Sequence, residues 1–210
     1  MGHHQNLLRI DYEDTSDLDQ DFSDQLFELF TKFIKSDYII LSDYAKGTLT
    51  PYLINKLINW ANNENKKIIV DPKPFHKEYY NNCHLITPNK KEAQEMTGIL
   101  LNRKEKIIEC GRKLMNELNC LVVITLGEEG MAVFGNDKNM QIIPTRAREV
   151  FDVSGAGDTA TAALTLGLSS GATLYQAAEI ANIAAGIKVS KMGTHPVSLD
   201  EIIHFIHGDE

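Results

Sequence analysis

Residues 152–159 read DVSGAGDT and lead straight into a helical pattern that is rich in Ala, Leu and Thr. Gly155 and Gly157 let the backbone approach a ligand closely. The first amides of a helix have no partner within the helix, so a helix that begins with small residues can bind an anion such as a phosphate. Asp158 falls in the first turn, where its ionised carboxylate could accept a proton from an attacking hydroxyl.

This turn also has a simpler interpretation, in which the glycines form a tight turn and Asp158 is an ordinary helix-start residue. The segment is not a dinucleotide-binding fingerprint, because residue 160 is Ala where the pattern G-x-G-x-x-G requires Gly. It is not a P-loop either, because no Gly-Lys-Ser/Thr follows. For the four residues Gly-Ala-Gly-Asp taken alone, the simpler interpretation is favoured.

Strand-length apolar runs alternate with helical patterns from about residue 21 onward. The predicted strands are 37–41, 67–70, 84–87, 121–125, 131–134 and 140–143. The predicted helices are 22–35, 50–62, 89–96, 103–118, 156–169, 174–189 and 199–206. This alternation predicts an α/β fold with a mostly parallel sheet and helices on both faces, ending in a β-hairpin that turns at residues 135–137. Ligands of such sheets bind beyond the carboxyl ends of the strands.

The composition excludes several classes of partner. Among the 210 residues, 21 Lys and Arg stand against 29 Asp and Glu, a net charge of −8, which disfavours binding to nucleic acid or to anionic membrane. The longest apolar runs are too short to span a bilayer, and residues 1–4 lack the apolar part of a signal peptide. The three cysteines form no Cys-x-x-Cys pair and the seven histidines form no zinc motif. We therefore expect a cytoplasmic protein with reduced thiols.

The DVSGAGDT stretch resembles the C-terminal signature of the ribokinase-like (PfkB) carbohydrate kinases. Other segments agree with that family in order and spacing: residues 42–47 (SDYAKG), 70–73 (VDPK), 87–92 (TPNKKE), 125–131 (TLGEEGM), 181–186 (ANIAAG) and 191–194 (KMGT). They resemble one subgroup, the D-glycero-D-manno-heptose 7-phosphate kinases, which stand alone or form the kinase half of a bifunctional kinase/adenylyltransferase. The resemblance covers essentially the whole chain and implies a three-layer ribokinase-like fold. The His-x-Gly-His signature of the adenylyltransferase is absent.

The resemblance implies a role for each residue of the 155–158 turn. Asp158 would be the catalytic base that activates a sugar hydroxyl for in-line attack on the γ-phosphate of ATP. The amides of Gly155, Ala156 and Gly157 would form an anion hole for the transferring phosphoryl group, where electrostatic stabilisation dominates the chemistry.

A second group of residues is implied to bind ATP and Mg²⁺. Asn89 and Glu92 match the family motif N-x-x-E, which orders Mg²⁺ through water, and Lys90 and Lys91 lie inside it. The alternative is that Asn89 caps a helix and Glu92 completes the capping box, and both roles can hold at once.

Three further residues are implied to contact the nucleotide. Thr125 and Gly127 resemble the end of the nucleotide-binding strand, where Gly leaves room for ribose or phosphates. Asn182 falls where the family packs residues around adenine, although it is also compatible with an ordinary polar helix residue.

A monovalent cation is implied at a separate position. Asp152, Ser154 and the neighbourhood of Gly193 match the place where many relatives bind such an ion through carbonyl oxygens. Potassium is therefore a candidate cofactor beside ATP and Mg²⁺.

Two lysines are candidates for binding a phosphate of the sugar or of ATP. Lys46 and Lys73 each follow a predicted parallel strand and lie next to Gly or Pro, and Lys is a suitable point charge for phosphate. Asp43, three residues before Lys46, is assigned to the same substrate side. The alternative is that both lysines are solvated loop residues.

The sequence departs from the family at its beginning. Relatives start with a portion that contains a Gly-Gly-x-x-Asn segment and the strands of a lid over the sugar, whereas this sequence starts after that portion. We expect residues 1–20 to form a residual edge or lid strand at Leu7–Tyr12 and an acidic connection, and residues 21–210 to form the nucleotide-binding and catalytic part. An unpaired sheet edge favours association with a second chain, so a homodimer is expected.

The resemblance predicts ATP-dependent phosphorylation of D-glycero-β-D-manno-heptose 7-phosphate to the 1,7-bisphosphate, on the way to ADP-heptose and the lipopolysaccharide core. Its two alternatives are another PfkB sugar kinase and a non-catalytic nucleotide-binding remnant. The ligands would be a small sugar phosphate and ATP.

Overall fold

A computed structural model describes residues 12–135, 140–146, 150–193 and 195–208. In chain order the elements are α1 (Gln20–Phe33), β1 (Tyr38–Ser42), α2 (Pro51–Asn63), β2 (Lys67–Asp71), the 3₁₀ helix η1 (Pro74–Tyr80), β3 (Leu85–Ile86), α3 (Lys90–Thr97), α4 (Lys104–Leu118), β4 (Leu121–Thr125), the 3₁₀ helix η2 (Gly127–Glu129), β5 (Met131–Phe134), β6 (Met140–Ile143), α5 (Ala156–Ser169), α6 (Leu174–Val189) and α7 (Leu199–His207). Within these ranges no helix is long and apolar enough to cross a membrane.

The strands of the described residues form one six-stranded sheet in the order β1-β2-β3-β4-β5-β6. Strands β1 to β4 are parallel, and β4, β5 and β6 pair antiparallel, which confirms the mostly parallel sheet and the terminal hairpin. The predicted hairpin turn falls largely outside the described residues. Because β1 to β4 run in the same direction, the residues that follow them meet at one edge of the sheet.

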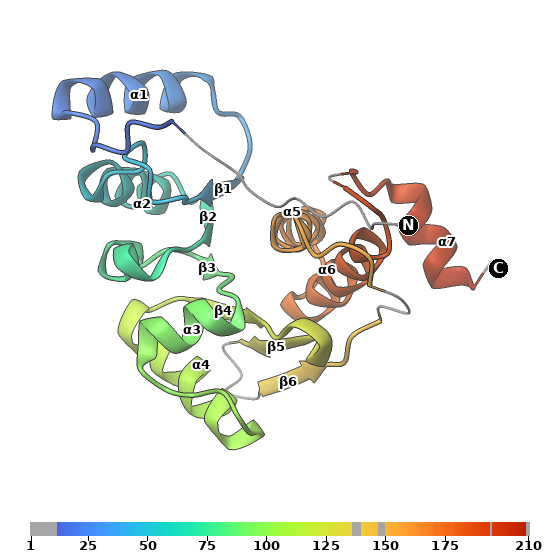
Figure 1. Ribbon diagram of the computed structural model, residues 1–210. Coiled ribbons are helices and arrows are strands. Elements are labelled where there is room, and N and C mark those ends of the chain that lie inside the picture. The colour runs from blue at the N-terminus through green and yellow to red at the C-terminus, as the bar shows by residue number, and fades with distance from the viewer. Residues whose placement is uncertain (1–11, 136–139, 147–149, 194, 209–210) are drawn as a thin grey trace.

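The sheet separates two hydrophobic clusters, as expected for helices on both faces. Along β2 the side chains alternate, since Ile68 and Val70 belong to one cluster and Ile69 belongs to the other. Helices α1 to α4 lie on the first side in Figure 1, and α5 and α6 cover the second, with α7 packed outside α6. The fold class predicted from the sequence is thus confirmed.

Helices α5 and α6 approach each other closely because their facing residues are small. A Cβ atom added to Gly167 would lie 3.0 Å from the Cβ of Ala177. Both helices are rich in buried alanines, so the pair packs as a unit against β1, β2, β5 and β6. This packing holds the beginning of α5 at the edge of the sheet where the parallel strands end.

The acidic segment before α1 has no regular structure over residues 12–19. Its last residue, Asp19, caps α1 by accepting a hydrogen bond from the amide of Phe22, and the amide of Leu18 donates to the carbonyl of Gly47 at 3.0 Å. The strand predicted for residues 7–12 lies, apart from Tyr12, outside the described residues.

Candidate active site

The DVSGAGDT turn begins helix α5 in the predicted way. Gly155 is the N-cap residue with a left-handed φ of 76°, a conformation that favours glycine. Glycine offers no capping side chain, so no N-cap side chain competes for the first amides of the helix, although the amide of Ala156 donates to the carbonyl of Val153 at 3.2 Å. Asp158 lies in the first turn and is exposed, as its predicted role requires.

The segment before Gly155 is fixed to the end of α6. The amides of Phe151 and Asp152 both donate to the carbonyl of Val189, at 2.7 and 3.2 Å. The Asp152 carboxylate then accepts the amides of Ser154 at 2.9 Å and Gly193 at 3.1 Å. The hydrogen bonds from Ser154, together with that from Gly193, hold the pKa of Asp152 below its ordinary value.

A cavity of about 470 Å³ opens beside this turn. The predicted nucleotide residues Thr125, Gly127 and Asn182 line it together with Ala156 and Gly157 of the turn. Asn182 is only 4% exposed and donates its side-chain amide to the carbonyl of Pro144 at 2.7 Å. The structure therefore brings together residues that are up to 57 positions apart in the sequence, around a space next to the start of α5.

Four carboxylates gather where the parallel strands end. Burial of Asp71 at the end of β2, followed by the negative charge of Glu92, raises its pKa to about 6, and the ammonium of Lys73 offsets part of that effect. Asp158 and Asp43 also raise the pKa of Asp71, although more weakly. Sequence reasoning did not identify Asp71 as a site residue, although it belongs to the VDPK segment.

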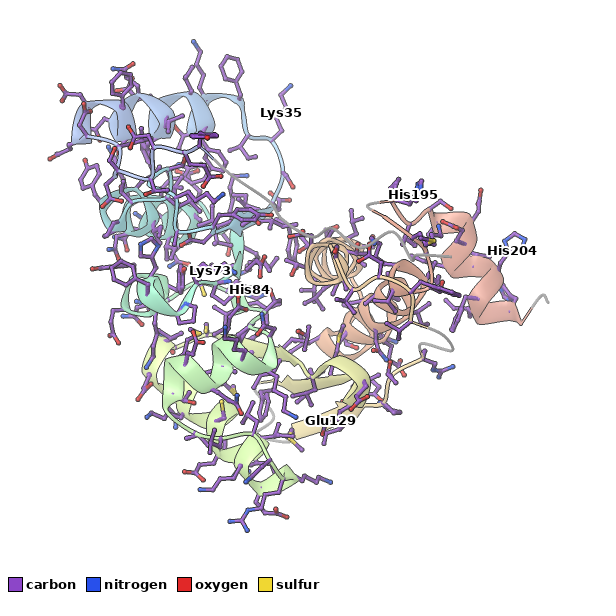
Figure 2. All side chains as sticks on the ribbon, viewed as in Figure 1. Lys35, Lys73, His84, Glu129, His195 and His204 are labelled. Atoms are coloured by element: carbon purple, nitrogen blue, oxygen red, sulfur yellow. The ribbon has the colours of Figure 1, made fainter. Side chains whose placement is uncertain are left out.

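Lys73, labelled in Figure 2, is partly exposed and forms an ion pair with Glu92. Its ammonium lies 2.6 Å from a carboxylate oxygen of Glu92. Burial works against its charge, but the hydrogen bond and the charge of Glu92, with those of Asp71 and Asp43, outweigh burial and raise the pKa of Lys73.

Asn89 and Glu92 form the capping box of α3 that the alternative interpretation predicted. The Asn89 side chain accepts the amide of Glu92 at 2.9 Å, and the Glu92 side chain accepts the amide of Asn89 at 3.0 Å. This box fixes the Glu92 carboxylate beside Asp71 and Lys73, so the capping role and a role at the site are compatible.

The other predicted lysines are not brought together. Lys46 is paired with Glu13 in the segment before α1. Lys90 pairs with Glu129, a residue of η2 that is labelled in Figure 2. The η2 residues Gly127 and Glu128 line the cavity, whereas Lys90 itself does not. The side chain of Lys91 is 84% exposed on α3, as expected for a solvated residue.

Asp43 faces the interior of the protein. It is 1% exposed, and one of its oxygens lies 2.7 Å from both the Tyr80 hydroxyl and the His76 ring nitrogen Nδ1. Its other oxygen accepts the amide of Ala45 at 2.7 Å. Asp43 therefore holds the loop after β1, in which the Tyr44 hydroxyl donates to Asp158 at 3.4 Å. Sequence reasoning missed His76, Tyr80 and Tyr44.

The residues present fit a hydrated Mg²⁺ that is shared with a phosphate ligand. Within the described residues, no three Asp, Glu, His or Cys side chains are arranged to hold a metal ion by themselves. Mg²⁺, however, keeps several waters and binds through one or two carboxylates together with substrate phosphates. The crowding of Asp71, Glu92 and Asp158 supplies such carboxylates beside the start of α5.

Comparison with known proteins agrees with this geometry. Residues 2–201 match the pfkB family of carbohydrate kinases. The bifunctional protein HldE of Helicobacter hepaticus is 40% identical over 205 residues, covering 97% of this chain and 42% of the relative. That of Campylobacter jejuni subsp. doylei is 42% identical over 208 residues, covering 98% and 44%. The chain thus spans less than half the length of the curated relatives it matches.

Solved structures share the fold at lower sequence identity. Phosphofructokinase-2 from Escherichia coli in complex with potassium matches with a TM-score of 0.81 and 22% identity, over 92% of this chain and 64% of that chain. Ribokinase from Arabidopsis thaliana, complexed with ribose and ATP, matches with a TM-score of 0.73 and 20% identity, over 91% and 60%. These likenesses show a ribokinase-like fold.

Proposed function

Because this chain belongs to the pfkB family of carbohydrate kinases, we propose that it transfers the γ-phosphoryl group of ATP to a hydroxyl of a sugar phosphate. One observation carries the proposal: the start of α5 borders two different environments. Ala156 and Gly157 line the cavity on one side. On the other side, Asp158 belongs to the cluster of carboxylates around Asp71. A phosphoryl group bound by the amides of this turn would lie between a nucleotide and a base.

The residues of the turn divide the chemistry between them. The carboxylate of Asp158 orients the acceptor hydroxyl and takes its proton as the bond to phosphorus forms. The amides at the start of α5 stabilise the charge on the phosphoryl oxygens. The hydroxyl of Tyr44, 3.4 Å from Asp158, helps to orient the carboxylate.

ATP binds, in this proposal, in the cavity lined by Thr125, Gly127 and Asn182, with its phosphates directed to the start of α5. Mg²⁺ would be held through water by Glu92 and Asn89, with Asp71 close to Glu92. When bound, the ion neutralises part of the phosphate charge. Lys90 is the remaining candidate contact to ATP, since it borders η2, whereas the exposure of Lys91 gives that residue less support.

The acceptor we propose is D-glycero-β-D-manno-heptose 7-phosphate, and the product its 1,7-bisphosphate, for ADP-heptose and lipopolysaccharide core biosynthesis. The support is the identity of about 40% to the bifunctional HldE proteins and the heptose-kinase resemblance of the SDYAKG and VDPK segments. Lys46 and Lys73 stay candidates for binding its phosphate, with Asp43 shaping the loop that carries Lys46.

A cytoplasmic location and a homodimer belong to the same proposal. ATP and sugar phosphates are cytoplasmic substrates. Strand β1 is the terminal strand of the sheet in the described residues, and Ile40 on it is 39% exposed. An open sheet edge of this kind can pair with a second copy of the chain.

The test compares phosphate transfer and nucleotide binding in matched variants. Asp158→Asn should lower turnover of heptose 7-phosphate by at least about 100-fold, while the Kd of ATP·Mg, measured by calorimetry, stays within about threefold. Asp200→Asn, the same change in the first turn of α7, should leave both unchanged.

Three results would contradict parts of the proposal. Retained turnover in Asp158→Asn removes this residue from the role of base. Faster turnover of fructose 6-phosphate or ribose than of heptose 7-phosphate replaces the proposed acceptor. Binding of ATP·Mg without turnover of any sugar leaves only a non-catalytic nucleotide-binding protein.

A further inference from the structure

Lys188, in the last turn of α6, is a lysine with almost no exposure to solvent. It is 2% exposed, and its ammonium donates to the carbonyl of Gly193 at 2.8 Å. Its Cε atom lies next to Gly155, the N-cap residue of α5, since a Cβ added to Gly155 would be 3.6 Å away. A buried charge is costly unless polar groups compensate it, so the surroundings of this ammonium indicate what it does.

The groups around the ammonium are a carboxylate, a backbone carbonyl and the C-terminal end of a helix, all of which favour a positive charge. The carboxylate of Asp152 is close enough for the charge of Lys188 to contribute to its lowered pKa, after the hydrogen bonds from Ser154 and Gly193. The carbonyl of Gly193 accepts the ammonium. Lys188 also lies at the C-terminal end of α6, where the helix dipole favours positive charge.

We propose that the ammonium of Lys188 is a built-in substitute for a monovalent cation, so that this chain positions its phosphate-binding turn without potassium. Asp152, Ser154 and Gly193 are the residues at which the resemblance implies such an ion. In the structure the Gly193 carbonyl is bonded to Lys188, and both oxygens of Asp152 accept backbone amides. A potassium ion at the same oxygens would meet a like charge.

A chain of contacts connects the ammonium to the anion-binding amides. The carbonyl of Gly193 accepts a hydrogen bond from Lys188, and the amide of Gly193 donates to Asp152. Asp152 also accepts a hydrogen bond from the amide of Ser154, which directly precedes Gly155. Lys188 does not line the cavity beside α5, so in this proposal it is a positioning residue that acts through Gly193 and Asp152. Its effect on ATP rests on the proposed function, whereas its effect on the stability of the turn does not.

The experiment varies the cation in solution at equal ionic strength, with potassium, sodium or tetramethylammonium chloride. The wild-type Kd for ATP·Mg should change by less than about twofold among the three salts, and the Tm by about 1 °C or less. Lys188→Ala should bind ATP·Mg about tenfold more weakly in tetramethylammonium, because a charged hydrogen bond is lost. Potassium ions, which can enter the vacated space, should restore its affinity to within about threefold.

Lys191→Ala is the matched control. Lys191 carries the same charge three residues later, but it pairs with Glu201 at a partly exposed position, so its loss should produce no potassium dependence. A general loss of charge or stability would affect both variants alike, whereas selective recovery in potassium reports the position that Lys188 occupies.

Two results would overturn the proposal: a wild-type protein whose ATP affinity or Tm rises strongly with potassium, and a Lys188→Ala protein that is unaffected in tetramethylammonium. If Lys188→Ala does not fold, the same Kd and Tm measurements on Lys188→Gln and on the wild-type protein in the three salts test whether Lys188 replaces potassium. If the wild-type protein does not bind ATP in any salt, the proposed function fails, and the Tm measurements still test the substitution of potassium by Lys188.

Discussion

The charged carboxylate of Asp71 destabilises the folded protein, and Asp71→Asn should therefore stabilise the chain at neutral pH. Folding raises the pKa of Asp71 from 3.8 to about 6, mainly through burial and through the charge of Glu92. The native state thus binds this proton more tightly than the unfolded chain does. The free energy of unfolding consequently falls as the pH rises from about 4 to about 6, and the full penalty is present above about pH 6.

The magnitude follows from the shift. A difference of about two pKa units corresponds to about 3 kcal/mol at 1.36 kcal/mol per unit. Asp71 is only partly buried, so solvent screening reduces the expected penalty to about 1–2 kcal/mol. At about pH 5, between the two pKa values, roughly half of that penalty is present.

Urea unfolding of wild type and Asp71→Asn at about pH 5 and about pH 7.5 measures this difference. The variant should be more stable than wild type at both values, and its advantage should about double at the higher pH. Asp37→Asn is the matched control, because the Asp37 side chain is 85% exposed beside β1 and should change stability by less than about 0.5 kcal/mol at either pH. A destabilised Asp71→Asn, or an advantage that does not depend on pH, would refute the reasoning.

Two further predictions concern packing. Replacing a helical Gly by Ala usually stabilises a helix, but a Cβ on Gly111 would lie 2.2–2.4 Å from ring atoms of Phe134. We therefore expect Gly111→Ala to lower the free energy of unfolding in urea by about 1–3 kcal/mol, and the added change Phe134→Leu to recover part of that loss. A gain in stability from Gly111→Ala alone would be incompatible with this contact. Tyr80→Phe removes a 2.7 Å hydrogen bond to buried Asp43 and should lower the free energy of unfolding by about 1–3 kcal/mol in the same assay. An unchanged urea midpoint would show that this hydrogen bond does not stabilise the loop after β1.

Local patterns in the sequence predicted most of the helices and strands. The predicted bounds of β4, β5, β6, α5 and α6 coincide with those observed. These segments are continuous apolar stretches with clear turn residues between them, so their periodicity decides their structure. The predicted strand 84–87 is shorter, because only Leu85 and Ile86 pair with both neighbours.

The 3₁₀ helix η1 was not predicted, because its order depends on contacts distant in sequence. The hydroxyl of Tyr80 and the ring of His76 are held by Asp43, which lies 37 and 33 positions away. Nothing in the local sequence Pro-Phe-His-Lys-Glu-Tyr-Tyr reveals this buried partner. It becomes visible only when β1 and β2 pair and bring the loops that follow them together.

The distinction between local patterns and contacts distant in sequence also applies to the site. The turn at residues 155–158 and the capping box of α3 are local motifs, and both were predicted. The perturbed pKa of Asp71 depends on carboxylates from α3 and α5 and so has no local signal. Lys188 does have a local signal: it is a single charge between Ile187 and Val189 in an otherwise apolar part of the 174–189 helix. A charge at such a position requires a buried partner.

The cost of Asp71 is informative because the same charge should become favourable when ligand binds. Alone, the carboxylates of Asp71, Glu92 and Asp158 repel one another, but a bound divalent cation would be attracted by all three and reverse that effect. Asp71→Asn should therefore bind ATP·Mg more weakly than wild type, by about tenfold, although the empty protein is more stable. A variant that gained stability and also kept its ATP·Mg affinity would show that Asp71 is buried for packing alone and lies outside the site of the cation and the phosphates.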